Sequence, residues 1–157
     1  MLMMYAGYPG ALEGLRVLHQ VWPGPTRARE TGGPAQWRAR GERLCTRVYG
    51  PAYRRLVPAV ESLHPDLATW MIEQGYGRVL ARPGLGARAR ELITVSALAA
   101  LGWERQLVSH VLGARRVGAS ADAVGEALRV GAAMADIEAQ AVAARTRERA
   151  EKSGALG

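Results

Sequence analysis

Apolar residues recur at helical spacing along nearly the whole chain, and no segment shows the sustained two-residue alternation of a half-buried strand. Clusters of proline and glycine separate the helical segments. The predicted helices span residues 1–21 with an interruption at 7–10, 35–49, 52–63, 64–77, 87–101, 103–116 and 128–145. We therefore expect an all-α protein.

The segment 23–34, PGPTRARETGGP, is rich in proline, glycine and polar residues and is typical of a linker. It separates a helix at 1–22 from the rest of the chain. With 157 residues, 48% of them hydrophobic, the chain has enough apolar material for one ordinary domain but not for two. We assign that domain to residues 35–150 and expect a disordered tail at 151–157.

The charge is strongly basic, with a net charge of +7, but arginines account for nearly all of it, since the only lysine is Lys152. The arginines are scattered along the chain, and no compact basic block is interleaved with exposed aromatic residues, as single-strand binding would require. We therefore expect no nucleic-acid partner. Most of the arginines belong to a solvated surface, and a few are available to hold a small anionic molecule.

Several classes of protein are excluded or disfavoured by what the sequence lacks. No apolar run approaches the roughly 18 residues of a membrane span, and the first residues do not form a signal peptide, so we expect a cytoplasmic protein with no membrane partner. The single cysteine, Cys45, excludes an internal disulfide and a CxxC motif and is most simply a buried apolar residue. His19, His64 and His110 lie in different segments without ligand spacing, so we expect no metal and no cofactor.

The predicted helices 87–101 and 103–116 are joined by a tight connection at Gly102, which makes them antiparallel neighbours. Glu91 lies on the apolar side of the first helix and His110 on the apolar side of the second. Their heights along the hairpin differ by roughly 4 to 5 Å at about 1.5 Å per residue. We predict a buried pair, hydrogen-bonded directly or through one water. Such a pair either performs proton chemistry or only holds the helices in register.

Three sequence blocks resemble the carboxymuconolactone decarboxylase family, which is related to the AhpD-like alkylhydroperoxidases. They are RARGERLCTRVYG at 38–50, QGYGRVLARPGLGARARELITVSALAALG at 74–102 and SHVLGARRVGAS at 109–120. The resemblance implies an AhpD-like helical domain built on an antiparallel hairpin. It also implies that Glu91 and His110 match the glutamate and histidine of the AhpD-type proton relay.

The resemblance is closest to the decarboxylase side of the family. The two positions that carry the CxxC cysteines in the AhpD-like branch hold Trp103 and Gln106 here, and neither residue supplies the thiolate that peroxidase chemistry requires. The family motif Tyr-Ala-Gly-x-Pro-x-Ala, which normally closes the domain, is similar to YAGYPGAL at 5–12. The motif order therefore looks displaced, as after a circular permutation or a cut in a tandem ancestor.

The resemblance implies a lyase that removes carbon dioxide from a small anionic carboxylactone. His110 is then the proton donor to the resulting carbanion, and Glu91 fixes its tautomer. Arg82 or Arg40 grips a substrate carboxylate, while Trp103 and Tyr76 form walls of the pocket. Two alternatives remain: a redox protein of the AhpD-like superfamily that works without the CxxC, and a non-catalytic assembly subunit.

The same resemblance implies a homo-oligomer, either a hexamer or a trimer, with active sites near subunit boundaries. The apolar residues Met71, Ile72, Val79 and Leu80 suggest a helix face that one copy leaves uncovered. We also expect the helix at 1–22 to pack beside the 91–116 hairpin of the same chain or of a neighbour.

Overall fold

The computed structural model describes residues 1, 3–24, 30 and 32–157, and all regular secondary structure in these residues is helical. The expected all-α fold is confirmed. The helices are α1 (Met3–Val21), α2 (Pro34–Tyr49), the 3-10 turn η1 (Gly50–Ala52), α3 (Tyr53–Glu61), α4 (Leu67–Trp70), the π-helix η2 (Met71–Leu80), α5 (Ala87–Leu101), α6 (Glu104–Arg116), α7 (Ala121–Ala132) and α8 (Ile137–Lys152). No helix in the described part of the chain is long and apolar enough to cross a membrane.

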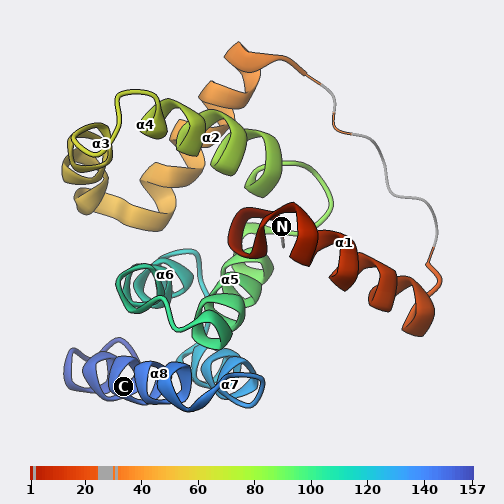
Figure 1. The fold of residues 1–157 in the computed structure, drawn as a ribbon. Helices are drawn as coiled ribbons and strands as arrows, with labels where there is room; N and C mark the ends of the chain where they lie inside the picture. The colour runs from red at the N-terminus through yellow and green to blue at the C-terminus, as the bar shows by residue number, and fades with distance from the viewer. Residues whose placement is uncertain (2, 25–29, 31) are drawn as a thin grey trace.

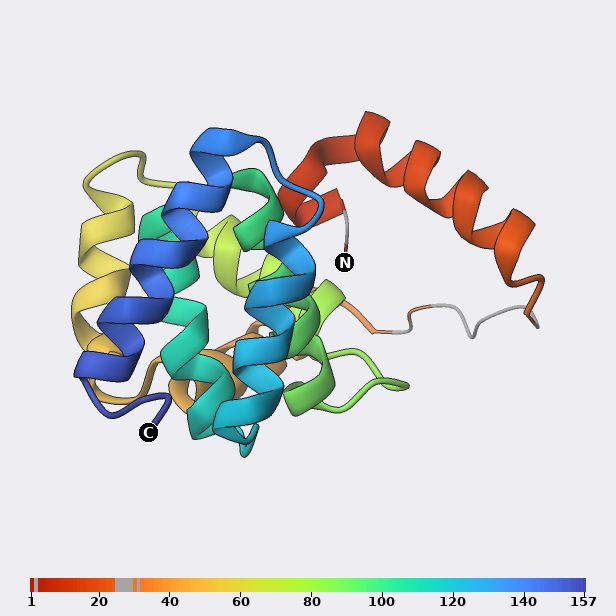
Figure 2. The same cartoon turned by 90° about the horizontal axis from the view of Figure 1, so that it is seen from below.

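The helices form two packed groups (Figure 1). One group contains α2, α3, α4 and η2, with a core that includes Leu44, Cys45 and Val48. The other contains α5 to α8, and its core includes Val95, Leu98, Leu107 and Val111. Figure 2 shows α7 and α8 side by side against the α5–α6 pair. The candidate chemistry lies where the two groups meet, because α2 packs against α6 as well as against η2.

The α5–α6 hairpin has nearly the predicted bounds. Gly102 ends α5 with a φ of 69°, a left-handed conformation that glycine adopts without the steric cost other residues meet. The tight turn places the apolar faces of α5 and α6 against each other. Leu101 and Trp103 flank this turn and are 40% and 45% exposed.

The contact between α2 and η2 depends on two glycines. A Cβ on Gly41 would collide with the carbonyl oxygen of Ile72, and a Cβ on Gly77 would collide with that of Trp37. The two backbones therefore approach more closely than side chains on these positions would allow. Within η2, the Ala81 N–H donates to the Tyr76 carbonyl five residues earlier at 2.7 Å, as expected in a π-helix.

Helix α1 is attached to the rest of the molecule mainly through its first turn. The Tyr5 and Thr94 hydroxyls are hydrogen-bonded at 2.7 Å, which places the beginning of α1 beside α5 in the same chain. A kink at Gly7, where φ is 66°, then directs the remainder of the helix away from the body (Figure 2). Only the first turn therefore occupies the position expected for the whole N-terminal helix. The expected linker lies partly outside the described residues, which omit 25–29 and 31.

Two other expectations are wrong. The C-terminal residues do not form a disordered tail from residue 151, since α8 continues to Lys152 and both Ala155 and Leu156 pack against the core of the second group. The apolar residues around the π-helix are not an uncovered face either. Ile72, Val79 and Leu80 are buried and Met71 is half-buried, since η2 packs closely against α2.

Candidate active site

The central feature of the candidate site is a direct hydrogen bond between Glu91 on α5 and His110 on α6. Nδ1 of His110 lies 2.8 Å from Oε2 of Glu91. The residues are only 2% and 5% exposed. The predicted contact between Glu91 and His110 is therefore a direct hydrogen bond and not one through a water. With Nδ1–H donating to the carboxylate, the lone pair or proton available for chemistry is on Nε2.

Gly113 makes room for this buried carboxylate. A Cβ at position 113 would lie 2.9 Å from Oε2 of Glu91 and 2.6 Å from a methyl group of Val48. The position lies three residues after His110 on α6, one helical turn away. The two ionisable groups compensate each other for the loss of water, and the small residue at 113 allows α2, α5 and α6 to close around them.

Two tyrosine hydroxyls continue the chain of polar groups beyond His110. The Tyr76 hydroxyl lies 3.5 Å from Nε2 of His110 and donates to the Tyr49 hydroxyl at 2.6 Å. The Tyr49 ring also contacts the imidazole in an edge-on arrangement, with 6.0 Å between ring centroids. Burial raises the pKa of both phenols above the ordinary value of 10, so both hydroxyls keep their protons at neutral pH. Tyr49 was not among the residues predicted for the site.

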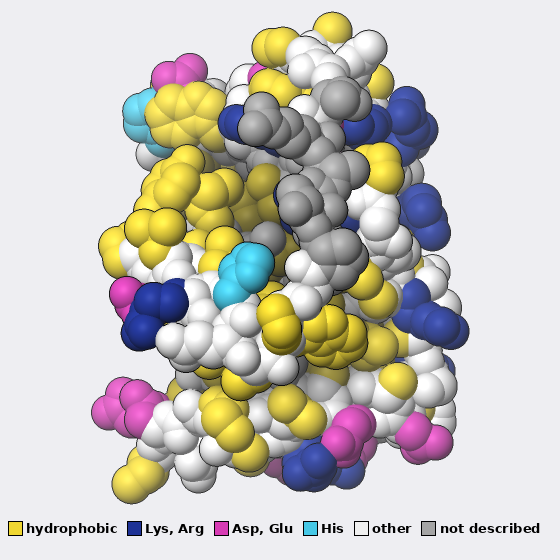
Figure 3. Space-filling model, turned by 90° about the vertical axis from the view of Figure 1, so that its right-hand side faces the viewer, with side chains coloured by type: hydrophobic (Ala, Val, Ile, Leu, Met, Phe, Trp, Pro, Cys, Tyr) yellow, Lys and Arg dark blue, Asp and Glu magenta, His cyan; other side chains and the backbone are white. Residues whose placement is uncertain are grey.

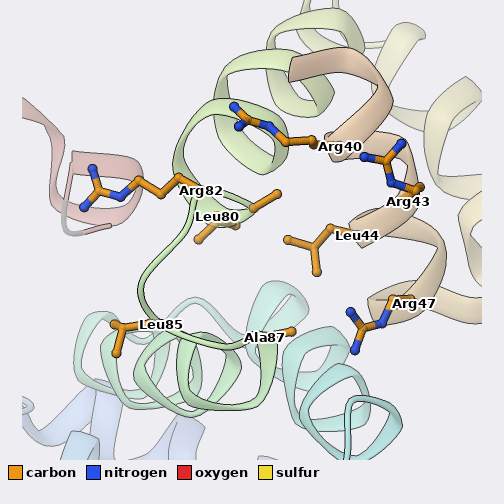
Figure 4. A pocket seen from close by; sticks show the side chains of 9 residues that line it. Arg40, Arg43, Leu44, Arg47, Leu80, Arg82, Leu85 and Ala87 are labelled. Atoms are coloured by element: carbon orange, nitrogen blue, oxygen red, sulfur yellow. The ribbon is translucent and has the colours of Figure 1, made fainter. Parts of the chain in front are cut away.

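A pocket of about 330 Å³ lies between α2 and the beginning of α5 (Figure 4). It contains both arginines that the sequence suggested for substrate binding, together with two that it did not. Its lining is Arg40, Arg43, Leu44 and Arg47 of α2, Leu80 at the end of η2, Ala87 of α5, and Ala81, Arg82 and Leu85 of the connection between them. The pocket thus combines guanidinium groups with an apolar floor, as a small organic anion requires.

The pocket carries an excess of positive charge. Arg40 is paired with Glu30, and this hydrogen bond lowers the pKa of the Glu30 carboxyl. Among the described residues, Arg43, Arg47 and Arg82 form no ion pair with a carboxylate. A bound anion would therefore meet guanidinium groups that no carboxylate of these residues neutralises.

The pocket lies one helical turn from the buried pair. Ala87 precedes Glu91 by four residues on α5, and Leu44 precedes Val48, the neighbour of Gly113, by four residues on α2. His110 itself does not line the pocket. The arginines and the acid–base pair are thus adjacent groups on the same helices.

Arg90 holds the part of the pocket wall that belongs to no helix. Its buried guanidinium donates to the backbone carbonyls of Arg82 at 2.7 Å, Leu85 at 2.9 Å and Pro83 at 3.3 Å. These bonds fix the turn that carries Arg82 and Leu85 to the pocket. The sequence offered one signal for this role, an arginine directly before the buried Glu91 and close after the Pro-Gly turn.

The other residues predicted for the site lie in different parts of the structure. Tyr76 belongs to the group around His110 but not to the arginine pocket. Trp103 lies at the α5–α6 turn, seven residues and thus about 10 Å along the helix from His110, and we do not carry it into the proposed site. Cys45 is fully buried, and burial raises the pKa of its thiol from 9.0 to about 12. It therefore lacks the thiolate that redox chemistry needs.

Within the described residues, no three His, Cys, Asp or Glu side chains are grouped as a metal site would require. Comparison with known families matches residues 65–148 to the carboxymuconolactone decarboxylase family. The matched segment contains both Glu91 and His110, as well as Tyr76 and the turn that carries Arg82. No curated protein matches the chain.

Proposed function

The chain belongs to the carboxymuconolactone decarboxylase family, and from this premise we propose that it is a carboxy-lyase acting on a small anionic carboxylactone. The observation that carries the proposal is the buried hydrogen bond between Glu91 and His110. An ionisable pair in an apolar helix interface is costly to bury, and pairs of this kind are frequent at sites of proton transfer. The neighbouring arginine pocket supplies the charge that an anionic substrate would need.

In the proposed reaction, the arginines hold a substrate carboxylate while a second carboxylate leaves. Breaking the bond between that carboxylate and the ring releases carbon dioxide and leaves an electron pair that is delocalised into the lactone carbonyl. Protonated His110 then delivers the proton on Nε2 to the carbanionic carbon and becomes neutral. Glu91 keeps the proton on Nδ1 in place and stabilises the charged imidazolium before this transfer.

The test is the ultraviolet absorbance of supplied carboxymuconolactone. We expect the wild-type protein to consume it, and we expect His110→Ala to abolish the consumption. Ser109→Ala is the matched control, because Ser109 is the preceding residue of α6 and its hydroxyl only donates to the Arg105 carbonyl at 3.1 Å. Retained activity in His110→Ala, or no consumption by a folded wild-type protein, would refute the proposal.

The arginines test substrate binding separately from proton transfer. Arg43→Gln and Arg47→Gln remove pocket charges that have no carboxylate partner among the described residues, so we expect KM to rise while kcat changes less. Arg55→Gln, an exposed arginine of α3 outside the pocket, is the control and should leave both constants unchanged. Equal loss in all three variants would mean that general charge, not the pocket, attracts the substrate.

We further propose that the protein forms a homo-oligomer, a trimer or a hexamer. This proposal is supported by the exposed apolar side chains on the projecting part of α1, including Leu12, Leu15 and Leu18. Figure 3 looks onto the side from which α1 projects and shows hydrophobic side chains at the surface there. A helix that presents such residues to solvent is best stabilised when another chain covers it.

A further inference from the structure

Nε2 of His110 is the nitrogen that must gain and lose the proton. Because His110 does not line the arginine pocket, a substrate held by the arginines must extend beyond the pocket to reach it. Nε2 faces the Tyr76 hydroxyl, and His110 is almost fully buried. After each proton delivery the imidazole must recover a proton from solvent. A group that connects Nε2 to the outside is therefore required by any proton chemistry at His110.

The two tyrosines supply a continuous set of hydroxyl groups for this connection. In the resting arrangement Tyr76 donates to Tyr49 at 2.6 Å, and a turn of both hydroxyls lets Tyr49 donate to Tyr76 and Tyr76 donate to Nε2. The 3.5 Å separation between the Tyr76 oxygen and Nε2 is long for a hydrogen bond, as is common for catalytic contacts without a substrate. Because burial raises the pKa of both phenols, a proton passes along them without either tyrosine becoming a stable anion.

Tyr49 lies on a different side of α2 from the pocket. Leu44, on the pocket floor, precedes Tyr49 by five residues, so the two side chains point roughly 140° apart around the helix at about 100° per residue. Tyr49 is half-buried, unlike Tyr76 and His110, and it ends α2 next to the short turn η1. The hydroxyl path therefore leads from the buried imidazole to the half-buried Tyr49, on a side of α2 separate from the anion pocket.

We propose that Tyr76 and Tyr49 form the proton path of His110. The substrate then reaches the site through the arginine pocket, and protons reach it through Tyr49. In each recharging step, Tyr49 accepts a proton from a hydronium ion, which becomes water, and passes its own proton to Tyr76, which passes its own to Nε2. Each tyrosine oxygen gains one proton and loses one, so the positive charge of the hydronium ion ends on the imidazole. The path requires no particular reaction, but its role in turnover rests on the proposed decarboxylase function.

The ionisable side chains around this path come from three packed elements, α5, α2 and α1. Glu91 of α5 bonds directly to His110, and Cys45 of α2, whose thiol stays protonated, lies near both tyrosines. Tyr5 of α1 lies near Tyr49, and the Glu91 carboxylate contributes to the raised pKa of Tyr5. None of these side chains makes a hydrogen bond to the Tyr49 hydroxyl in the described residues.

The experiment compares Tyr49→Phe and Tyr76→Phe with Tyr53→Phe. Tyr53 packs against the same core as Tyr49 and follows it by four residues, but its hydroxyl makes no side-chain hydrogen bond to the described residues, so it is a matched control. Each substitution removes one oxygen and keeps the aromatic ring. Exchange of the His110 ring protons with water is measured by nuclear magnetic resonance on protein with ¹⁵N-labelled histidine, and turnover is measured with carboxymuconolactone.

We expect Tyr49→Phe and Tyr76→Phe to slow the exchange of the Nε2 proton by about tenfold or more and to lower kcat with little change in KM. Tyr53→Phe should match the wild type in both measurements. Unchanged exchange in Tyr49→Phe and Tyr76→Phe would overturn the path. Slowed exchange together with an inactive wild-type protein would support the path and refute the proposed decarboxylase function. An active wild type whose kcat does not respond to either substitution would overturn the role of the path in turnover.

Discussion

At the scale of the residue, Glu91 is a buried carboxylate whose partner is a single imidazole. Removing one member of a buried pair leaves the other without compensation, which typically costs about 3–5 kcal/mol. We therefore expect Glu91→Ala to lower the free energy of unfolding by an amount in this range, measured by urea denaturation. Glu126→Ala removes a fully exposed carboxylate paired with Arg129 and should leave stability nearly unchanged. Equal effects in the two variants would contradict the burial argument.

A second prediction at this scale concerns Cys45 and the dependence of stability on pH. The pKa of its thiol is about 12 in the folded protein, above the ordinary value of 9.0, so the unfolded chain loses this proton first as pH rises. The contribution to stability is complete below pH 9 and is lost between pH 9 and 12, by about 1.4 kcal/mol per pH unit within that window.

Urea denaturation at several pH values tests this expectation. Tyrosines with raised pKa values also make the wild-type protein less stable at alkaline pH. The contribution of Cys45 is therefore measured as the difference in stability between the wild type and Cys45→Ala. That variant should lose less stability between pH 9 and 12. Parallel stability curves for the two proteins would contradict the assignment.

At the scale of the element, the packing of α2 on η2 depends on a close approach between backbones. A Cβ added at Gly41 would collide with the Ile72 carbonyl, which is backbone and cannot move aside as a side chain can. We expect Gly41→Ala to destabilise the protein by about 1–3 kcal/mol or more, and to disturb the π-helix that positions Tyr76. Thermal unfolding and circular dichroism measure both effects.

Gly125 of α7 is the matched control for this prediction. It also lies inside a helix, but a Cβ there would meet nothing within 4 Å. Gly125→Ala should raise stability by about 0.4–1 kcal/mol, because alanine restricts the unfolded chain without strain in the folded one. Opposite signs for the two alanine variants are therefore expected, and a loss of stability in both would mean that helix propensity does not act here as assumed.

At the scale of the whole molecule, α1 is the part whose surroundings within one chain are incomplete. Leu15 and Leu18 are both about half exposed on its projecting part. If another copy covers this helix, the combined Leu15→Gln and Leu18→Gln variant should shift the mass from that of an oligomer towards the 16.9 kDa of one chain. Size-exclusion chromatography with light scattering measures the mass.

Met134→Gln combined with Ile137→Gln is the control, since both side chains are highly exposed but lie at the α7–α8 turn. This variant should keep the wild-type mass. A monomeric wild type would refute the proposed oligomer. A stable oligomer in the α1 variant would place the interface elsewhere.

The helices, the α5–α6 hairpin and the pairing of Glu91 with His110 could be predicted from the amino-acid sequence. Helical periodicity is a local property, and Gly102 fixes a short connection, so the register of the hairpin follows from counting residues. The family resemblance was likewise available from the sequence alone. The π-helix was not, because the pattern of apolar residues does not reveal a shift from four to five residues between bonded groups.

The surroundings of the Glu91–His110 pair could not be predicted, because they depend on how distant helices pack. Tyr49 and Tyr76 lie 27 residues apart, and Arg43 and Arg47 reach the same pocket as Arg82 only because α2 packs against η2. The burial of Ile72 and the exposure of Leu15 were also settled at this level, since both residues sit on apolar helix faces of similar appearance. Which of two such faces is covered depends on the distant segment that packs against it, and periodicity within one helix carries no information about that segment.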